Sequence, residues 1–430
     1  MNANQKEAAD LVVSFITKEP QYAIPSVPVN VDGKSTTEEF DNIVKAFLNE
    51  HKNDHSLTHL NEIEFDFLIN NKLLRNTIKE FVDKEKISGE EQLEVEYFTK
   101  TKPPEPHNSF LHDDWVSSVD TMDDWILSGC YDNTAHIWDV QSGKHKIAIP
   151  AHNAPIKAVK WISFGQADET YHFVTCSHDE TCMIWKWNSK LNKHVEHIFT
   201  FIGHSRSVDC VDVKNDLVLT GSYDRMLKVW SLVENEQPKV SESKQKDANS
   251  NKSNKLRSPV ITIEGHKEAI TGCSWMSSTE SDISTAATVS LDNSIKIWDI
   301  ELGEQKQTLT SNKPLMDIDY SKTTALLLTS SCDRHIRLWD SRQNEGAQIR
   351  SVYSSHSGWV SSVAWSKTNP NLFVSGSYDS SVKEWDIRSP SAPLYDMLGH
   401  HEKVLAVNWS NKDFIVSGAS DNQIKIFANK

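Results

Sequence analysis

A small set of polar side chains recurs along most of the chain, and its members are residue types that can do chemistry. Each copy contains a Ser or Thr, an Asp four residues later and an aromatic residue six residues after that; six copies also have a His upstream. A His, an Asp and a hydroxyl within hydrogen-bonding distance can activate a nucleophile, and His with Asp can also bind a metal ion. Because each repeat carries one set, the sets do not converge as a single catalytic or metal site requires.

The repeated set has seven copies that differ at few positions. The hydroxyl residue, the Asp and the aromatic residue are Ser128, Asp132 and Trp138; Thr175, Asp179 and Trp185; Thr220, Asp224 and Trp230; Thr288, Asp292 and Trp298; Thr329, Asp333 and Trp339; Ser375, Asp379 and Trp385; Ser417, Asp421 and Phe427. The upstream histidines are His112, His152, His204, His266, His356 and His400. The fifth copy has Ser311 in place of His, and the seventh ends in Phe. We predict a complete set in copies one to four and six, and expect packing to matter more in the other two.

These residues can satisfy one another inside a folded repeat. A buried Asp must be paired, and a His backed by a hydroxyl and an indole N–H can pair it. The sequence contains no phosphate-binding glycine loop, no nucleophile elbow and no HExxH motif. We therefore predict a structural network in each repeat, and we expect no enzymatic activity, no cofactor and no metal of the protein's own.

The repeats resemble the WD-repeat family, down to the phrases YDNTAHIWD, LDNSIKIWD, CDRHIRLWD and YDSSVKEWD. The resemblance implies a mainly β fold, a seven-bladed WD40 propeller of four-stranded blades over residues 107–430. The chain ends at FANK, directly after the third strand of the last repeat. A closed ring needs a fourth strand there, and residues 105–111 are the natural source.

One spacing between blade aromatics is longer than the others, that between Trp230 and Trp298. The extra residues, 234–258, have no aromatics and many Ser, Asn and Lys, which predicts a disordered insertion. Its lysines are compatible with a weak nuclear import signal or with a solvated linker.

Composition limits the classes of function. The formal charge is −15, so a broad basic face for nucleic acid is not expected, although a local basic patch remains open. The six cysteines show neither CxxC pairs nor a secreted disulfide spacing, which favours a reducing compartment. No signal-like N-terminus and no apolar stretch of about 18 residues occurs, so a membrane role is not expected.

Residues 9–100 predict a separate α+β domain. Two strands are followed by an amphipathic helix, with apolar residues at helical spacing from Phe40 to Leu48, and then by a strand, a turn at Asn70–Asn71 and a short strand. A short helical turn and a last strand complete the order β-β-α-β-β-β, which resembles ubiquitin. No Gly-Gly terminus follows, because the chain continues into a linker at 101–106, so we expect a built-in docking module.

With both domains and the phrases FDFLINNKLLR, HDDWVSS and HSGWVSSVAW, the chain resembles the YTM and WD-repeat-protein-twelve family of ribosome biogenesis proteins. Notchless-type proteins share the domain order, but their propellers have eight blades. The resemblance implies a scaffold in biogenesis of the large (60S) subunit, needed for 5.8S and 25S/28S-type rRNA and located in the nucleus, nucleolus and nucleoplasm. It implies a PeBoW-type complex with Bop/Erb-type and Pescadillo-type proteins on pre-60S particles, and release by the midasin AAA ATPase. Direct RNA contact stays open.

The resemblance also implies a site in the ubiquitin-like domain. In this family a glutamate of that domain enters the metal site of midasin, and the matching residue here is Glu90, with Glu91 as the fallback. A carboxylate on an exposed loop can occupy a vacant coordination position of a hard divalent cation. Without the family, two solvated acids in a loop would be the simpler interpretation.

Aromatic residues near the repeat aspartates are candidate contacts on one propeller face. Trp115 and Trp359 stand three residues after a repeat His, and Tyr131, Tyr223 and Tyr378 directly precede a repeat Asp. They either form an exposed partner anchor or pack under neighbouring loops. A second class of function, a WD-repeat adaptor in the ubiquitin and proteasome system, stays open beside the ribosomal scaffold.

Overall fold

The computed structural model divides the chain into two compact units, Met1–Lys102 and Pro103–Lys430. The predicted linker, 101–106, spans this division, but its last two residues belong to a strand of the second unit. The structure describes residues 11–51, 63–87, 92–162, 170–190, 195–233, 255–276, 284–342 and 348–429.

The N-terminal unit has the β-grasp topology expected of a ubiquitin-like domain. Its five-stranded sheet has the order β2-β1-β5-β3-β4, with β1 and β5 parallel at the centre. The predicted short helical turn is the eight-residue helix α2, capped by the Thr77 hydroxyl, which accepts from the N–H of Glu80. The elements are β1 (Leu11–Ile16), the 3-10 helix η1 (Pro20–Tyr22), β2 (Pro28–Val31), α1 (Thr37–His51), β3 (Phe65–Ile69), β4 (Lys72–Leu73), α2 (Ile78–Glu85) and β5 (Leu93–Thr99).

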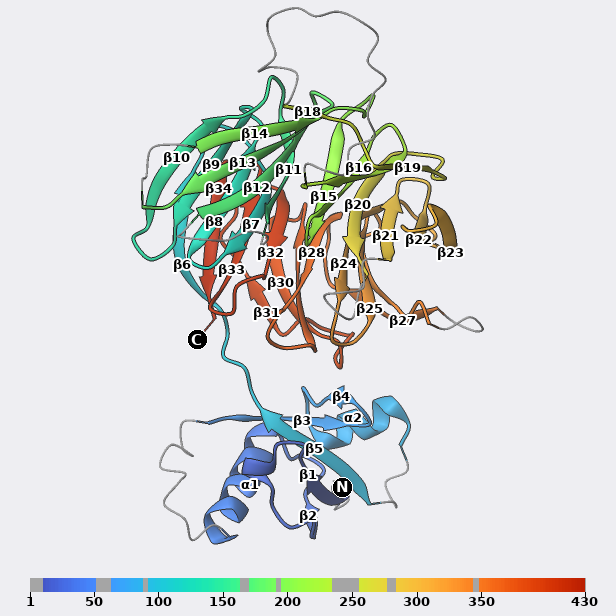
Figure 1. Ribbon diagram of the computed structural model, residues 1–430. Helices are drawn as coiled ribbons and strands as arrows, with labels where there is room; N and C mark the ends of the chain where they lie inside the picture. Colours follow the sequence, from blue (N-terminus) through green and yellow to red (C-terminus); the bar gives the residue numbers. More distant parts are fainter. Residues whose placement is uncertain are drawn as a thin grey trace, which may run out of the picture. The chain divides into compact units, whose positions relative to one another are not determined.

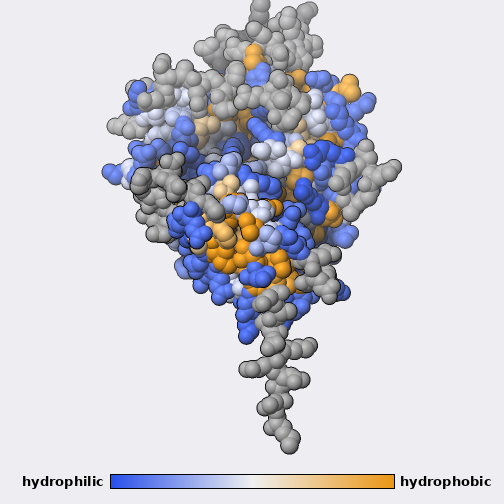
Figure 2. Space-filling view, turned by 90° about the horizontal axis from the view of Figure 1, so that it is seen from below, coloured by the Kyte–Doolittle hydropathy of each residue, from blue (hydrophilic) through white to orange (hydrophobic). Residues whose placement is uncertain are grey.

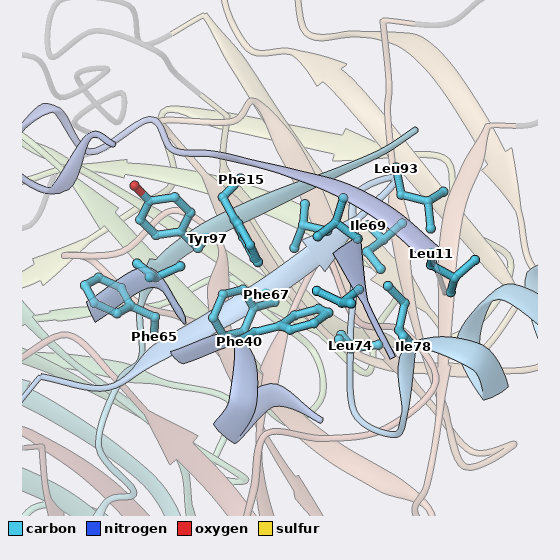
Figure 3. Packing of buried hydrophobic residues seen from close by; sticks show 14 of the residues in the cluster. Leu11, Phe15, Phe40, Phe65, Phe67, Ile69, Leu74, Ile78, Leu93 and Tyr97 are labelled. Atoms are coloured by element: carbon cyan, nitrogen blue, oxygen red, sulfur yellow. The ribbon is translucent and has the colours of Figure 1, made fainter. Parts of the chain in front are cut away.

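An aromatic core holds helix α1 on this sheet (Figure 3). Phe40, from α1, meets Phe15 and Phe67 edge to face, with ring centroids 5.5 Å apart in both pairs. Such contacts are stabilising beyond the burial of apolar area. The turn between β3 and β4 needs two residues with positive φ, and Asn70 (51°) and Asn71 (60°) supply them, as the sequence predicts.

The second unit is a ring of seven blades (Figure 1). Each blade is an antiparallel sheet in which the first strand of a repeat is innermost. The strands are β7 (Val116–Met122), β8 (Trp125–Cys130), β9 (Thr134–Asp139) and β10 (Lys144–Pro150) in blade 1; β11 (Ile156–Ile162), β12 (Thr170–Ser177), β13 (Cys182–Asn188) and β14 (Val195–Phe201) in blade 2; β15 (Val208–Lys214), β16 (Leu217–Ser222), β17 (Met226–Ser231) and β19 (Ile261–Glu264) in blade 3; β20 (Ile270–Trp275), β21 (Thr285–Ser290), β22 (Ser294–Asp299) and β23 (Glu304–Thr310) in blade 4; β24 (Leu315–Ser321), β25 (Leu326–Ser331), β26 (His335–Trp339) and β27 (Ile349–Ser354) in blade 5; β28 (Val360–Trp365), β29 (Leu372–Ser377), β30 (Val382–Asp386) and β31 (Tyr395–Met397) in blade 6; β32 (Val404–Asn408), β33 (Phe414–Ala419) and β34 (Gln423–Ala428) in blade 7.

Blade 7 is completed by a strand from the other end of the unit. Strand β6 (Glu105–Leu111) pairs antiparallel with β34, from Glu105 opposite Ala428 to Leu111 opposite Gln423. In Figure 1 the cyan β6 leads into blade 7 from the N-terminal side of the unit. The prediction that residues 105–111 supply the missing fourth strand is confirmed, and it explains why the predicted linker is too long by two residues.

The predicted disordered insertion, 234–258, is wrong at its C-terminal end. Strand β18 (Leu256–Arg257) pairs in parallel with β14, the outer strand of blade 2. The guanidinium of Arg257 lies 3.6 Å from the ring centroid of Phe199 and donates to the carbonyl of Ser231 at 2.9 Å. Stacking and a buried hydrogen bond thus order this end, signals that composition alone does not carry. Residues 234–254 lie outside the described residues.

Hydrophilic residues make up most of the face in Figure 2, and hydrophobic residues gather in one area of it. Within the described ranges, no helix is long and apolar enough to cross a membrane.

Candidate functional site

Four blades contain the complete predicted chain of polar residues. In blade 3, His204 Nδ1 lies 2.8 Å from the Asp224 carboxylate and Nε2 lies 2.8 Å from the Thr220 hydroxyl, which also accepts from the Trp230 indole at 2.8 Å. The same three contacts, all between 2.7 and 3.0 Å, link the predicted residues in blades 2, 4 and 6.

Burial and hydrogen bonding determine the charge states of the Asp and the His in this polar network. Burial alone would raise the pKa of Asp224, but the hydrogen bond and charge of His204 and the N–H groups of Met226 and Ser205 lower it to about 2. Burial also lowers the pKa of His204, against the pull of Asp224. The pair is therefore an ionised Asp and a neutral His at pH 7, which satisfies both buried groups.

Blade 1 departs from the prediction at one contact. His112 Nε2 lies 2.9 Å from Ser128, and Trp138 donates to the same hydroxyl at 3.1 Å, but the buried Nδ1 of His112 has no partner. Asp132 instead accepts from Thr134 and lies 3.9 Å from His136, whose ring stands edge-on to His112. The predicted pairing of His112 with Asp132 is therefore wrong, because His136 lies on the side of the Asp that the repeat His occupies in other blades.

Blades 5 and 7 retain polar chains where packing was expected to dominate. In blade 5, Arg337 binds Asp333 through two N–H groups, and Trp339 donates to Thr329 at 2.8 Å. In blade 7, His400 contacts Asp421 at 3.0 Å and Ser417 at 2.7 Å without an indole. Arg337 stands two residues before the blade Trp, the same place as His136, so this position supplies the substitute partner in both altered blades.

These chains do not converge on a reaction centre. They lie one per blade, and the part of the chain that the structure describes contains no group of three or more His, Cys, Asp or Glu that could hold a metal ion. Their chemistry is the mutual satisfaction of buried polar groups, which leaves the exposed face as the candidate site.

Two matched aromatic pairs stand on that face. The indole of Trp115 packs on Tyr131 with ring centroids 5.5 Å apart, and Trp359 packs on Tyr378 at 5.7 Å. In each pair the Tyr N–H donates to the carbonyl of its Trp, at 3.0 and 2.8 Å. The two Trp residues are 45% and 49% exposed, so they do not pack under neighbouring loops.

The two tyrosines line one recess of about 180 Å³, together with Lys157 and Asp209. Lys157 Nζ donates to the Tyr131 hydroxyl at 3.0 Å, which fixes that tyrosine at the recess. Blades 1 and 6 therefore bring Tyr131 and Tyr378 to one opening, and Trp115 and Trp359 pack on these two tyrosines; we call the four aromatic residues and the opening the aromatic recess. Tyr223, the fifth candidate, lies elsewhere, in a groove between blades 3 and 4.

The recess shares lining residues with a polar channel of about 240 Å³ that sequence reasoning missed. Its charged residues include the half-buried Lys160, whose Nζ lies 3.7 Å from the Asp120 carboxylate and 4.0 Å from that of Asp212. Burial raises the pKa of Asp317 and of Asp319 to about 6. A signal was present, since LMDIDY places two acids, Asp317 and Asp319, at alternate positions of an inner strand.

The channel acids also join blades. Asp120, Asp212 and Asp319 stand at one register position in blades 1, 3 and 5. Each carboxylate accepts a hydrogen bond, at 2.8 Å, from the backbone N–H of a Trp on the first strand of the next blade. The three donors are Trp161, Trp275 and Trp365. They are therefore structural as well as charged.

The site predicted in the ubiquitin-like domain cannot be placed. Glu90 and Glu91 lie outside the described residues, between the end of α2 at Glu85 and the start of β5 at Leu93. Their proposed role depends on sequence alone.

Comparison with known proteins identifies both units. The NLE (NUC135) domain family matches residues 11–82, and the WD domain, G-beta repeat family matches residues 105–139, 143–186, 195–231, 257–299, 303–340, 347–386 and 391–427. A ribosome biogenesis protein WDR12 homolog of Ixodes scapularis is 43% identical over 433 residues, covering 99% of this chain and all of the relative. The chain belongs to the WDR12 homolog family.

Other WDR12 homologs match equally broadly. That of Drosophila pseudoobscura pseudoobscura is 45% identical over 97% of this chain and 95% of its own, and that of Aedes aegypti is 40% identical over 99% and 97%. The family resemblance and the fold class predicted from the sequence are therefore confirmed.

Proposed function

We propose that this WDR12-family chain is a non-enzymatic scaffold in biogenesis of the large ribosomal subunit. The observation that carries the proposal is the identity of 43% that spans both units of a relative named as a ribosome biogenesis protein. The blade architecture supports a scaffold, since the repeated His, Asp and hydroxyl groups bond to one another within single blades. Maturation of 5.8S and 25S/28S-type rRNA, in the nucleolus and nucleoplasm, is the process in which this scaffold acts.

The aromatic recess is the proposed docking surface for a Bop/Erb-type or Pescadillo-type partner. Half-exposed Trp and Tyr residues are the side chains that most often anchor protein interfaces. Their backbone hydrogen bonds and ring stacking hold the anchors in place before binding, which lowers the entropy cost of association. Replacing Trp115 and Trp359 by Ala should abolish recovery of these partners while the melting temperature changes little; unchanged recovery contradicts the anchor.

Glu90 is the proposed contact to the metal site of midasin. A single carboxylate can complete the coordination of a hard divalent cation held by the partner, and it is released when the partner's site changes shape. Such a contact suits a factor that is removed from a particle once its work is done.

One purification tests the function and the site together. Tagged wild type, Glu90→Ala and the matched control Glu91→Ala are purified, and the recovered proteins and rRNAs are identified. We expect pre-60S factors with all three, and loss of midasin with Glu90→Ala alone. Recovery of proteasome or cullin subunits in place of pre-60S factors would support the ubiquitin-adaptor function instead, and loss with Glu91→Ala alone would move the site by one residue.

A further inference from the structure

A basic groove lies between blades 3 and 4, apart from the aromatic recess. It measures about 460 Å³ and is lined by residues 205–206, 223–225 and 268–269, which we call the blade 3–4 groove. Arg206 and Arg225 are exposed there, and the exposed Lys267 adjoins Glu268 of its lining. The ring of Tyr223 is 47% exposed. In a chain with a formal charge of −15, such a cluster of cations around an aromatic ring is unusual.

The polar chain of blade 3 holds the loops of this groove. Asp224, bound by His204, also accepts the N–H of Ser205 at 3.0 Å. The backbone N–H of Tyr223 donates to the backbone carbonyl of Ser207 at 2.9 Å. The Ser222 hydroxyl donates to the backbone carbonyl of Arg206 at 3.2 Å. Both loops that carry the cations are therefore fixed before any ligand arrives, as tight binding requires.

The cations keep most of their hydrogen-bonding capacity. Arg225 lies in the left-handed region (φ 73°) and donates one hydrogen bond, to the carbonyl of Lys267 at 3.4 Å. The described residues include no partner for the side chains of Arg206 or Lys267. Glu268 likewise has a free carboxylate, whereas that of Asp224 is occupied. The groove thus offers guanidinium donors, one acceptor and one ring face.

This combination occurs in only one repeat of the sequence. The places of Arg206 and Arg225 are taken by Asp114 and Asn133 around Tyr131 in the first repeat. In the sixth repeat Gly358 and Ser380 flank Tyr378. The turn itself therefore does not demand arginines, and their presence at both places needs another reason.

We propose that the blade 3–4 groove binds single-stranded RNA. Arg206 and Arg225 bind phosphate oxygens, a base stacks on Tyr223, and Glu268 accepts from a ribose 2′-hydroxyl. An acidic peptide would use the cations but not the exposed ring or the free carboxylate, so RNA fits the groove better. The inference rests on the proposed function, which it deepens by adding a direct RNA contact to the scaffold.

Binding by the purified full-length protein tests the groove without other factors. The probe is a short fluorescein-labelled single-stranded RNA of mixed sequence, followed by anisotropy over a range of salt concentrations. Replacing both arginines by Gln should reduce the slope of log K against log salt by about 1.4, since each phosphate contact on a single strand contributes about 0.7. Tyr223→Ala should weaken binding about tenfold with little change in slope, and Tyr223→Phe should retain it.

Controls separate the groove from general charge and from misfolding. Lys144→Ala with Lys412→Ala removes two exposed cations, one at the start of β10 and one between β32 and β33, and should leave affinity unchanged. Melting temperatures show that each variant is folded. Three outcomes would each overturn the inference. The first is equal RNA affinity of the arginine variant and wild type, and the second is equal affinity of wild type for DNA and RNA of one sequence. The third is tight binding of an acidic phosphopeptide without binding of RNA. Because the purification of tagged protein reports assembly, failure here with intact pre-60S recovery removes the RNA contact but not the scaffold.

Discussion

Blades 3 and 7 are two copies of the same repeat motif, but different contacts hold them together. Blade 3 draws all four strands from its own part of the ring and joins His204, Asp224, Thr220 and Trp230 in one polar chain. Blade 7 has three strands of its own, borrows β6 and has Phe427 in place of the indole. The comparison shows that a blade can form its four-stranded sheet without the indole of the polar network when a strand from the other end of the unit pairs with it.

Both neighbours of blade 7 contain a buried polar atom without a partner. In blade 1 the Nδ1 of His112 has no partner, and in blade 6 the buried Glu384 has one carboxylate oxygen without a partner. Other contacts hold the closure: Phe110, from β6, stacks on Trp138 at 4.7 Å, and Asn408 of blade 7 bonds to Asp120 and Thr121 of blade 1 at 2.9 Å. The contacts that close the ring therefore lie beside the incomplete polar network of blade 1.

Removing the closing strand should have the largest effect. A propeller that starts at His112 lacks β6 and leaves β34 as an open edge, whereas one that starts at Pro103 keeps the pairing. We expect the shorter form to melt at least about 10 °C lower, or not to fold. Calorimetry or circular dichroism of the two fragments checks this, and equal melting temperatures would mean that β6 does not close the ring.

Removing the repeat Asp should destabilise a blade with a complete polar network more than a blade with an altered one. Asp224→Ala leaves a buried His and two N–H groups without their acceptor, so we expect a loss of about 3 kcal/mol. Asp132→Ala in blade 1 removes the hydrogen bonds from Thr134 and the longer contact with His136, and should cost about 1 kcal/mol. Urea unfolding of both variants measures the difference. Equal losses in the free energy of unfolding would show that the missing contact between His112 and Asp132 does not affect stability.

Glu384 should make the joint between blades 6 and 7 sensitive to pH. Burial, and secondarily the charge of Asp386, raises the pKa of Glu384 to about 8. Between its ordinary pKa of about 4.3 and 8, the native state binds more protons than the unfolded state, so the free energy of unfolding falls as pH rises.

The variant Glu384→Gln removes this titration. Its stability gain over wild type should grow steadily from pH 5 to pH 8, because only wild type must take up a proton at this position on folding. The exposed Glu264→Gln is the matched control and should show no such growth. A constant difference between Glu384→Gln and wild type across this range would contradict the buried titration.

The substitute chain of blade 5 should give the smallest effect. Arg337→Lys replaces two N–H groups on Asp333 by one ammonium, so we expect a loss of about 1 kcal/mol. Arg342→Lys is the control: its side chain is exposed where it pairs with Asp340, and the substitution should cost less than about 0.5 kcal/mol. If the two losses are equal in denaturant titrations, Arg337 does not replace the missing histidine.

Much of the fold was predictable because the repeat fixes it locally. The spacing from Ser128 to Trp138 and its six repetitions predicted the blades, and the chain's end at FANK predicted the closing strand. The position of His136 relative to His112 could not be predicted, since it depends on ring packing between strands. The contacts of the channel acids and of Arg257 could not be predicted for another reason: their partners lie on other blades.

The covalent route between the two units has a mechanical consequence. Only residues 100–104 separate the last strand of the ubiquitin-like domain from β6, and β6 is the strand that closes the ring. Tension applied to the small domain therefore travels along the backbone directly into the seam of the propeller. A force on the N-terminal unit therefore acts first on β6, and detachment of β6 would leave blade 7 without its outer strand and open the ring.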